Sequence, residues 1–173
     1  MLSIIQPPEP GSAEELSDFL AVVKQYENRK VPQKLQDMCD KKMHVMMIKY
    51  LESFGIHVNQ KEAFDTLNKV RPIVDMLKTY FNRARPDAFA RECNLDWNDD
   101  YLDSAQTPSY PSGHTLQAYY LAGVLGRNFP EHADGLNSIA EMISQSRIDR
   151  GVHFPSDIEY AKLLAQEIIS LCY

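Results

Sequence analysis

Three short segments combine histidines, basic side chains and turn-forming residues in a pattern that could support catalysis. One of them, SRIDRGVHFPSD, spans residues 146–157 and places His153 four residues before Asp157. A carboxylate that binds one imidazole nitrogen fixes the tautomer, so that the other nitrogen presents its lone pair. A histidine near an aspartate is more often structural than catalytic, but here Arg147 also lies six residues before the histidine. The segment therefore predicts that Asp157 orients His153, and a purely structural pair stays open from this stretch alone.

The second segment, SYPSGHT at residues 109–115, places Pro111, Ser112 and Gly113 directly before His114. Proline and glycine interrupt regular structure, and serine favours the N-cap of a helix. Two interpretations stay open from this stretch alone. It is a turn that starts a helix with an incidental histidine, or it is a helix N-terminus cleared of bulk so that an anion can reach its free N–H groups.

The remaining segment, KTYFNRARP at residues 78–86, carries Lys78 and Arg85. Between Arg71 and Arg91 there are five basic and two acidic residues, which makes this a positive region in a chain of net charge −6. A solvated basic helix end that complements the helix dipole is the simpler interpretation, and composition alone does not decide against it.

Taken together, the three segments supply two histidines, an orienting carboxylate, at least three cations and a helix N-terminus. Phosphoryl transfer spreads negative charge over the equatorial oxygens, so it depends on positioning and electrostatic stabilisation. It also needs a nucleophile and an acid for the leaving group. The combination predicts phosphoryl transfer through a covalent phosphohistidine, with residues 111–114 supplying N–H donors and a proton donor.

Bulk properties narrow the classes of protein. The 173 residues fit a single domain, residues 1–173, with ordinary hydrophobic (44%) and charged (24%) contents. A net charge of −6 argues against nucleic acid or an anionic membrane as the main partner. No apolar run is long enough to span a membrane, and the N-terminal MLSIIQPPEP lacks the features of a signal peptide. We therefore expect a cytoplasmic protein, and a homo-oligomer stays open.

Hydrophobic periodicity predicts an all-α fold, a helical bundle of about six to eight helices. A capping box, Ser12 with Glu15, begins the first helix, and Gly55 ends the second. Pro72 is expected to kink or restart the third. Residues 86–111 read as a long, partly acidic loop. Three more helices follow at about 114–128, 134–146 and 156–171, the last with Ser156 as its cap.

Other polar residues receive simpler interpretations. Arg83, Asp149 and Arg150 flank the motifs and could support them, but ordinary surface charge is the default. The acidic cluster Asp96, Asp99 and Asp100 is expected to be a solvated loop rather than a cation site, because its spacing matches no metal-binding loop. Three histidines have no partner at motif spacing and are interpreted as surface or core residues: His44, His57 and His132.

The arrangement of the three segments resembles a known signature. Lys78-x6-Arg85-Pro86, then Pro111-Ser112-Gly113-His114, then Ser146-Arg147-x5-His153-x3-Asp157 is similar to that of the phosphatidic-acid-phosphatase type 2 superfamily. This group includes class A acid phosphatases, lipid phosphatases and vanadium haloperoxidases. The stretches PPEPGS and RARPDAF extend the likeness to the soluble bacterial class A non-specific acid phosphatases. The resemblance implies the all-α fold of that group.

The resemblance also implies roles. His153 resembles the nucleophile, Asp157 the carboxylate that orients it, and His114 the general acid that then activates water. The phosphate clamp would comprise Lys78, Arg85, Arg147, Ser112 and Gly113. No metal ion or other cofactor is implied, because the cations belong to the chain, and phosphate or vanadate would occupy the site. A bell-shaped, acid-leaning pH–rate profile is expected.

The leading hypothesis is a soluble, metal-independent phosphatase that acts on small phosphomonoesters. Alternatives are a pyrophosphate or lipid-phosphate hydrolase, a vanadate-dependent haloperoxidase and a non-catalytic phosphate-binding module. Two departures from the resemblance bear on these. Class A enzymes are usually exported with a signal peptide, which this sequence lacks, and Asp87 follows Pro86 where an apolar or aromatic side chain is expected. The aspartate at position 87 bears on the pocket that would hold the leaving group.

Overall fold

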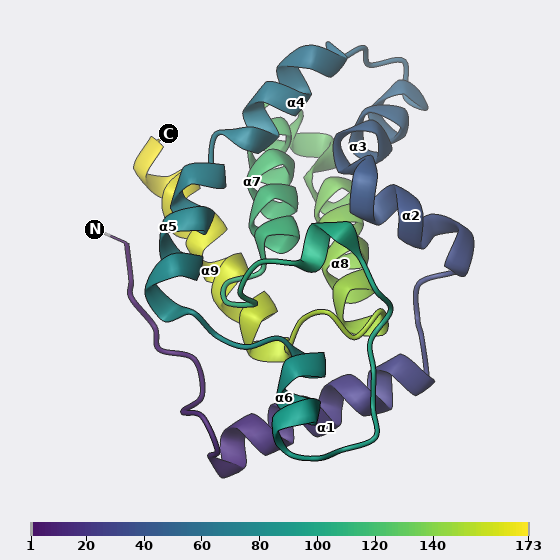
Figure 1. Ribbon diagram of the computed structural model, residues 1–173. Coiled ribbons are helices and arrows are strands. Elements are labelled where there is room, and N and C mark those ends of the chain that lie inside the picture. Colours follow the sequence, from purple (N-terminus) through teal and green to yellow (C-terminus); the bar gives the residue numbers. More distant parts are fainter. Residues whose placement is uncertain (1, 173) are drawn as a thin grey trace.

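The computed structural model describes residues 2–172, which form α-helices joined by loops and two short 3-10 turns, with no strand among them (Figure 1). The predicted all-α class is confirmed. The α-helices are α1 Ala13–Glu27, α2 Gln33–Lys41, α3 Met43–Glu52, α4 Gln60–Asn68, α5 Arg71–Phe81, α6 Pro86–Glu92, α7 Gly113–Asn128, α8 Ala133–Asp149 and α9 Pro155–Cys172. The 3-10 turns are Asp103–Ala105 and Pro130–His132.

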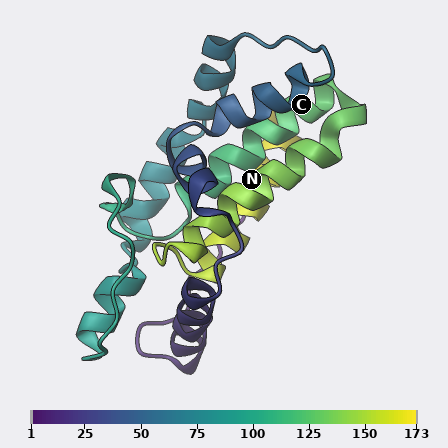
Figure 2. The ribbon, with the colours of Figure 1, turned by 90° about the vertical axis from the view of Figure 1, so that its right-hand side faces the viewer.

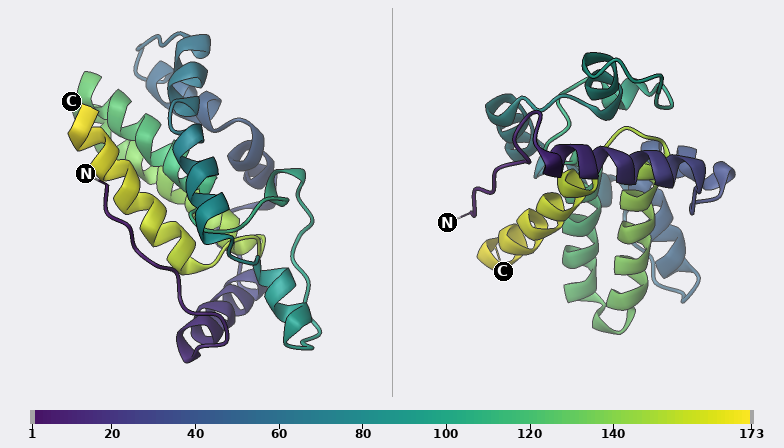
Figure 3. Two further views of the ribbon diagram at one scale, coloured as in Figure 1. Left: turned by 60° about the vertical axis from the view of Figure 1, so that its left-hand side comes forward. Right: turned by 90° about the horizontal axis from the view of Figure 1, so that it is seen from below.

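Helix α7 packs against both α8 and α9, and these three helices form the centre of the molecule (Figure 1). Apolar side chains such as Leu116, Leu121 and Ile143 are fully buried there, which supplies the main driving force for this packing. Helices α2, α3 and α4 cover one side of α7 and α8 (Figure 2). Helix α1 lies across the ends of the central helices and contacts α8 and α9 (Figure 3).

The predicted helix ends are partly confirmed. Ser12 Oγ accepts the N–H of Glu15 at 3.1 Å, as expected for an N-cap. Gly55 adopts a positive φ of 78° just after α3, which a glycine does at little cost. The stretch that ends there is two helices rather than one, because the chain leaves helical geometry at Lys42 (φ −137°). Pro72 lies in the first turn of α5, so it restarts the helix as predicted.

Two local predictions are wrong. Residues 86–92 are not loop but helix α6, which begins with Pro86 at a position where a proline costs no hydrogen bond. Helix α9 begins at Pro155, so Ser156 is inside its first turn and is not the cap. The Ser156 hydroxyl donates instead to Asp18 of α1.

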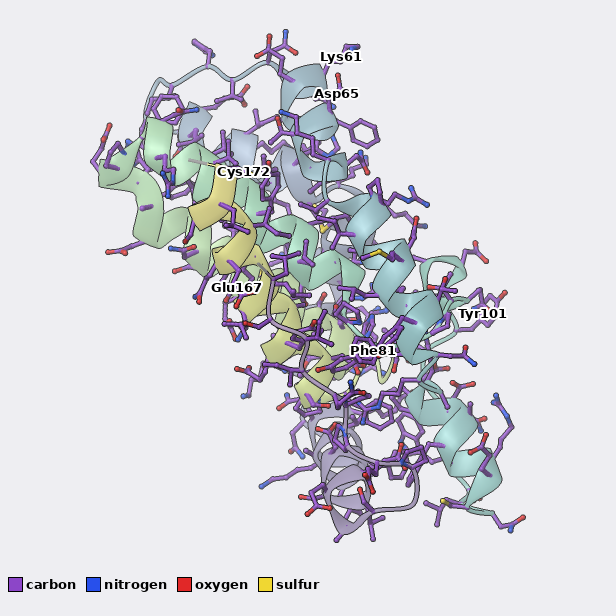
Figure 4. All side chains as sticks on the ribbon, turned by 90° about the vertical axis from the view of Figure 1, so that its left-hand side faces the viewer. Lys61, Asp65, Phe81, Tyr101, Glu167 and Cys172 are labelled. Atoms are coloured by element: carbon purple, nitrogen blue, oxygen red, sulfur yellow. The ribbon has the colours of Figure 1, made fainter. Side chains whose placement is uncertain are left out.

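The N-terminal ends of α7 and α9 and the C-terminal end of α8 meet at one end of the central layer, above α1 (Figure 1). An aromatic contact holds α5 to this end. Phe81, at the end of α5, is labelled in Figure 4, and its ring lies 5.0 Å from that of Tyr110, which in turn stacks on Tyr160 of α9 at 4.9 Å. By contrast, Tyr101 on the connection between α6 and α7 is exposed to solvent. The predicted motifs are therefore carried to a common place by packed elements.

Candidate active site

The three sequence segments come together at this end of the helices. The N–H of Ser112 donates to the carbonyl of Asp157 at 3.1 Å, which joins the start of α7 to the start of α9. Arg85 Nη1 lies 3.3 Å from His153 Nε2, which joins the α5–α6 connection to the α8–α9 turn. A Cβ placed on Gly113 would lie 3.9 Å from Lys78 Cε.

His153 is held in one orientation. Its Nδ1 lies 2.9 Å from Asp157 Oδ2, the geometry expected if a protonated Nδ1 donates to the carboxylate. The same oxygen accepts the N–H of Phe154 at 2.9 Å. Gly151 makes the preceding turn with a φ of 73°. Burial, together with the nearby charges of Arg85 and other cations, holds the pKa of His153 well below its usual 6.5, so the ring is neutral.

Arg83 is buried beside this pair, so the interpretation of its charge as ordinary surface charge is wrong. Its Nη1 donates to Asp157 Oδ1 at 2.7 Å, and its Nη2 donates to Asp18 Oδ2 at 3.0 Å. The guanidinium also lies 3.9 Å from the centre of the Phe154 ring. Arg83 thereby fixes the carboxylate that orients the histidine, and it connects that carboxylate to α1.

Asp149 and Arg150 are also buried, which corrects the same interpretation for them. Asp149 Oδ2 accepts the N–H groups of Lys30 and Val31 at 2.8 and 2.7 Å. Arg150 pairs with Asp100 at 3.5 Å. The contacts of Asp149 hold the C-terminal end of α8, and with it Arg147, against the α1–α2 connection, while the pair of Arg150 and Asp100 holds it against the loop between α6 and α7.

The acidic cluster of the long loop is only partly solvated. Arg29 binds Asp100 at 2.8 Å. Asp99 is partly buried, and burial with the nearby charge of Asp87 raises its pKa to about 6. Among residues 2–172, no three histidine, cysteine, aspartate or glutamate side chains come close enough together to hold a metal ion.

Two of the predicted clamp cations bind the loop that precedes residue 109. Arg85 Nε donates to the carbonyl of Thr107 at 2.7 Å and its Nη1 donates to that of Val152 at 2.6 Å, while Lys78 Nζ donates to the carbonyl of Pro108. Burial, reinforced by neighbouring cations, lowers the pKa of Arg85 to about 10 and that of Lys78 below its usual value. Such crowding of positive charge is unfavourable without an anion, so it favours anion binding at this place.

Arg147 is fully buried, with an exposure of 0%. Its Nη1 donates to Asp40 Oδ1 at 2.6 Å and its Nη2 donates to Ser104 Oγ at 3.2 Å. Its Nε finds no hydrogen-bond partner within the described chain. A buried N–H without a partner is costly, and an anion bound here would remove that cost.

His114 contacts the same aspartate. Its Nε2 lies 2.9 Å from the backbone carbonyl of Asp40 and 3.3 Å from Asp40 Oδ1. Burial and the charge of Arg147 lower the pKa of His114, while the hydrogen bonds and charge of Asp40 oppose that shift. The sequence carries no signal for Asp40 or Ser104, because neither lies within one of the three motifs and both are common polar residues in polar surroundings.

Ser112 and Gly113 begin α7 as predicted. Ser112 is buried, and its Oγ accepts from Thr115 Oγ1 at 3.0 Å and from the Thr115 N–H at 3.4 Å. Its own N–H is bound to Asp157, so its hydroxyl proton and the Gly113 N–H, which has no acceptor within the helix, are the donors left for a ligand.

A cleft of about 380 Å³ opens beside this cluster, between α2, α4, α5 and α7. Lys78, Gly113 and His114 line it, whereas His153, Arg85 and Arg147 are buried and are not part of its lining. Asp87, which departs from the family resemblance at a position that bears on the leaving-group pocket, does not line this cleft. It pairs with Arg91 at 2.7 Å on α6.

A larger cavity of about 710 Å³ lies between the N-terminal segment and α6, and none of the eight predicted site residues lines it. The smaller cleft is therefore the candidate site on chemical grounds. Of the helices within residues 2–172, none combines the length and the apolar character needed to cross a membrane.

Comparisons with known proteins identify a family and relatives that the chain resembles. The sequence model of the PAP2 superfamily matches residues 69–173 of the chain, a region that includes all eight predicted site residues. The chain is 29% identical over 165 residues to a non-specific acid phosphatase of Salmonella typhimurium, covering 88% of this chain and 66% of that protein. It is also 29% identical over 131 residues to one of Providencia stuartii, covering 70% and 52% respectively. The chain thus spans between about half and two thirds of the length of these relatives.

A solved structure shares the fold. It is that of a transmembrane PAP2 type phosphatidylglycerolphosphate phosphatase from Bacillus subtilis, with a TM-score of 0.60 and 19% sequence identity, covering 92% of this chain and 84% of that one. At this level of identity the likeness concerns the fold alone. The matched family model covers more than half of the chain and establishes that the chain belongs to the PAP2 superfamily.

Proposed function

We propose that the protein is a phosphatase that hydrolyses small phosphomonoesters through a phosphohistidine on His153, using its own cations in place of a metal ion. One observation carries the proposal. His153 Nδ1 is bound to Asp157 at 2.9 Å, and Nε2 faces the guanidinium of Arg85 at 3.3 Å. A neutral imidazole so oriented can attack phosphorus with Nε2, at a place where cations stabilise the developing charge.

In the first step, the Nε2 lone pair of His153 forms a bond to phosphorus, and the bond from phosphorus to the leaving oxygen breaks. His114 gives a proton to that oxygen, so an alcohol departs. The positive charge that develops on the His153 ring is stabilised by Asp157, while Arg85, Arg147 and Lys78 offset the charge on the phosphoryl oxygens.

In the second step, water attacks phosphorus and gives a proton to His114, which now acts as a base. The P–N bond breaks, and its electrons return to Nε2 of His153. Phosphate leaves, and both histidines are restored to their starting protonation states. The balance requires no oxidant, reductant or co-substrate other than water.

Access to His153 involves the loop before residue 109. His153 is 1% exposed, and the carbonyls of Thr107 and Pro108 bind Arg85 and Lys78. A phosphoryl group that reaches Nε2 competes with these carbonyls for the same cations. Since a charged phosphoryl oxygen is a stronger acceptor than a carbonyl, the exchange favours the ligand.

The direct test is hydrolysis of an aryl phosphate between about pH 4 and about pH 8, with and without a chelator. We expect chelator-resistant turnover that is lost in His153→Ala and kept in His57→Ala, a control histidine that is exposed far from the cleft. Activity that the chelator abolishes, or that survives in His153→Ala, would overturn the proposal.

The substrate class rests on the acid phosphatase relatives, so it is tested by competition among phosphorylated compounds. We expect alkyl and aryl phosphates to be hydrolysed in preference to pyrophosphate and to phosphatidic acid in detergent. Preference for either of the last two would replace the substrate class while keeping the chemistry. Halide oxidation with added vanadate and peroxide, without phosphatase activity, would assign the haloperoxidase alternative.

A further inference from the structure

Asp40, at the end of α2, lies outside the matched family region and yet meets two predicted site residues. Its Oδ1 accepts from Arg147 Nη1 at 2.6 Å and from Ser104 Oγ at 2.5 Å, and lies 3.3 Å from His114 Nε2. Its backbone carbonyl is 2.9 Å from the same nitrogen. A single residue therefore binds both the deepest clamp cation and the predicted acid.

These contacts distinguish the two nitrogens of His114. A carbonyl and a carboxylate both accept hydrogen bonds, so Nε2 must carry a proton to satisfy them. In the neutral ring, Nδ1 then holds the lone pair. Because His114 lines the cleft at the start of α7, Nδ1 is the nitrogen left to exchange a proton with a bound substrate.

We propose that Asp40 is the positioning residue for His114, fixing the Nε2–H tautomer through its carbonyl and favouring the protonated ring through its carboxylate. The inference rests on the proposed function for its catalytic consequence, whereas the contact between the two residues stands without it. In the first step, Nδ1–H is then the bond that breaks as the leaving oxygen takes the proton. In the second step, Nδ1 regains a proton from water.

The electrostatics of the site explain why this support matters. Burial and Arg147 on α8 both lower the pKa of His114, and Asp40 on α2 opposes them. The carboxylate remains ionised because hydrogen bonds from His114 and Ser104, with the charge of Arg147, outweigh the burial that would raise its pKa. Other charged or titratable groups lie around the same cleft or close to His114: Lys41, His44, Arg71, Asp75, Lys78, Asp103 and His153.

The wild-type protein provides the first test. Histidine labelled with ¹⁵N, with the signals of His114 assigned by their loss in His114→Gln, reports both the tautomer and the pKa of this ring. We expect the neutral ring to carry its proton on Nε2. A neutral ring protonated on Nδ1 would overturn the proposal without any variant of Asp40 having to fold.

The second test is Asp40→Asn, in which the amide keeps an acceptor for Arg147 and Ser104 but loses the charge. We expect the ¹⁵N titration of His114 and the alkaline limb of kcat to move down together by about 1 pH unit, since an opposite charge within a few ångströms has that effect. At a pH above the alkaline limb, kcat of Asp40→Asn for an alkyl phosphate should be about tenfold lower than that of the wild type. For an aryl phosphate, kcat should fall less, because its leaving group needs less protonation to depart.

Two further variants separate this role from a structural one. Asp37→Asn removes a charge one turn earlier on α2, where the side chain is 74% exposed, and should leave both titrations in place. Asp40→Glu restores the charge and should recover the alkaline limb at least in part. An unchanged His114 titration in a folded Asp40→Asn protein would refute the positioning role.

Failure of the proposed function would look different. If the wild type hydrolyses no phosphate ester but Asp40→Asn still shifts the His114 titration, the coupling of the two residues stands and the assigned activity falls. If the wild type is an active phosphatase and the titration does not move, the activity stands and the positioning role falls.

Discussion

The two predicted catalytic histidines sit in different surroundings. His153 is buried and held by Asp157, which is itself bound by Arg83, and Arg83 reaches Asp18 on α1. His114 lines a cleft and is bound by Asp40 through contacts of 2.9 and 3.3 Å. The nucleophile side is thus a chain of buried polar contacts that reaches α1, whereas the acid side is a carboxylate shared by His114 and Arg147 beside the cleft.

The difference has a physical basis. A nucleophile must keep one tautomer and one direction throughout the reaction, so it benefits from rigid, fully paired neighbours. An acid must give up and regain a proton in every cycle, so its pKa has to stay near the working pH and its proton has to reach the substrate. We therefore expect changes on the nucleophile side to abolish activity and destabilise the fold, and changes on the acid side to tune the pH dependence.

The largest expected effect separates the two histidines by their dependence on the leaving group. His153→Ala should reduce kcat on the order of 10⁶-fold for every substrate, because catalytic residues that act as a unit fail together. In His114→Ala, kcat should fall less for an aryl phosphate than for an alkyl phosphate, because an aryl oxygen can leave without full protonation. Steady-state kinetics with both substrates would measure this.

An equal loss in the two variants with both substrates would break the comparison, since it would mean that His114 does more than protonate the leaving group. Folding of both variants is checked by circular dichroism before the kinetics are compared.

The next effect concerns stability on the nucleophile side. Arg83→Met leaves Asp157 and Asp18 without their partner, and removing one member of a buried ion pair costs about 3–5 kcal/mol. Urea unfolding, read as the change in the free energy of unfolding, measures this. A loss below about 1 kcal/mol, as for an exposed pair, would show that the chain of ion pairs does not hold the fold.

How much of this could be predicted from the sequence differs between the two sides. The spacing of His153 and Asp157, and the stretches around Lys78 and Ser112, fall within single segments, so their types and order were informative. Arg83 lies within one of these segments, but the sequence predicts only surface charge for it, because its partners lie 65 and 74 residues away. The sequence also carries no sign of α6, since a seven-residue helix that begins with a proline shows too little periodicity to be distinguished from a loop.

Asp40 could not be predicted at all. Its contact with Arg147 spans 107 residues and depends on how α2 packs against α8, which no local pattern encodes. The break at Lys42, which separates α2 from α3, likewise interrupts a stretch whose hydrophobic period continues. Local sequence therefore predicts the nucleophile side well and the acid side only at its histidine.

A smaller effect is the pH dependence of stability. The pKa of buried His153 lies well below 6.5, so below about pH 6.5 the unfolded chain binds a proton that the folded chain does not. The free energy of unfolding should fall with decreasing pH by about 1.4 kcal/mol per pH unit from this residue. His153→Gln should flatten that slope. Urea unfolding from about pH 6.5 downward measures it, and an unchanged slope in His153→Gln would contradict a neutral, buried ring.

The smallest expected effect is at Arg91, which pairs with Asp87 on α6 and is largely exposed. Arg91→Met should change the free energy of unfolding by less than about 0.5 kcal/mol, since exposed pairs four residues apart contribute little. Arg91→Met is the matched control for Arg83→Met, and kcat should also be unchanged. A tenfold loss of kcat would show that Asp87 affects the site, contrary to its position away from the cleft.

The central claim is that His153 carries the phosphoryl group, and trapping the intermediate tests it most directly. Rapid acid-free quenching after mixing with a ³²P-labelled aryl phosphate should leave label on the wild-type chain, stable to alkali, labile to acid and mapped to His153. His114→Ala should accumulate more of it, because water attack is slowed, and His153→Ala should hold none. Label on another residue, or equal label in His153→Ala, would contradict the account.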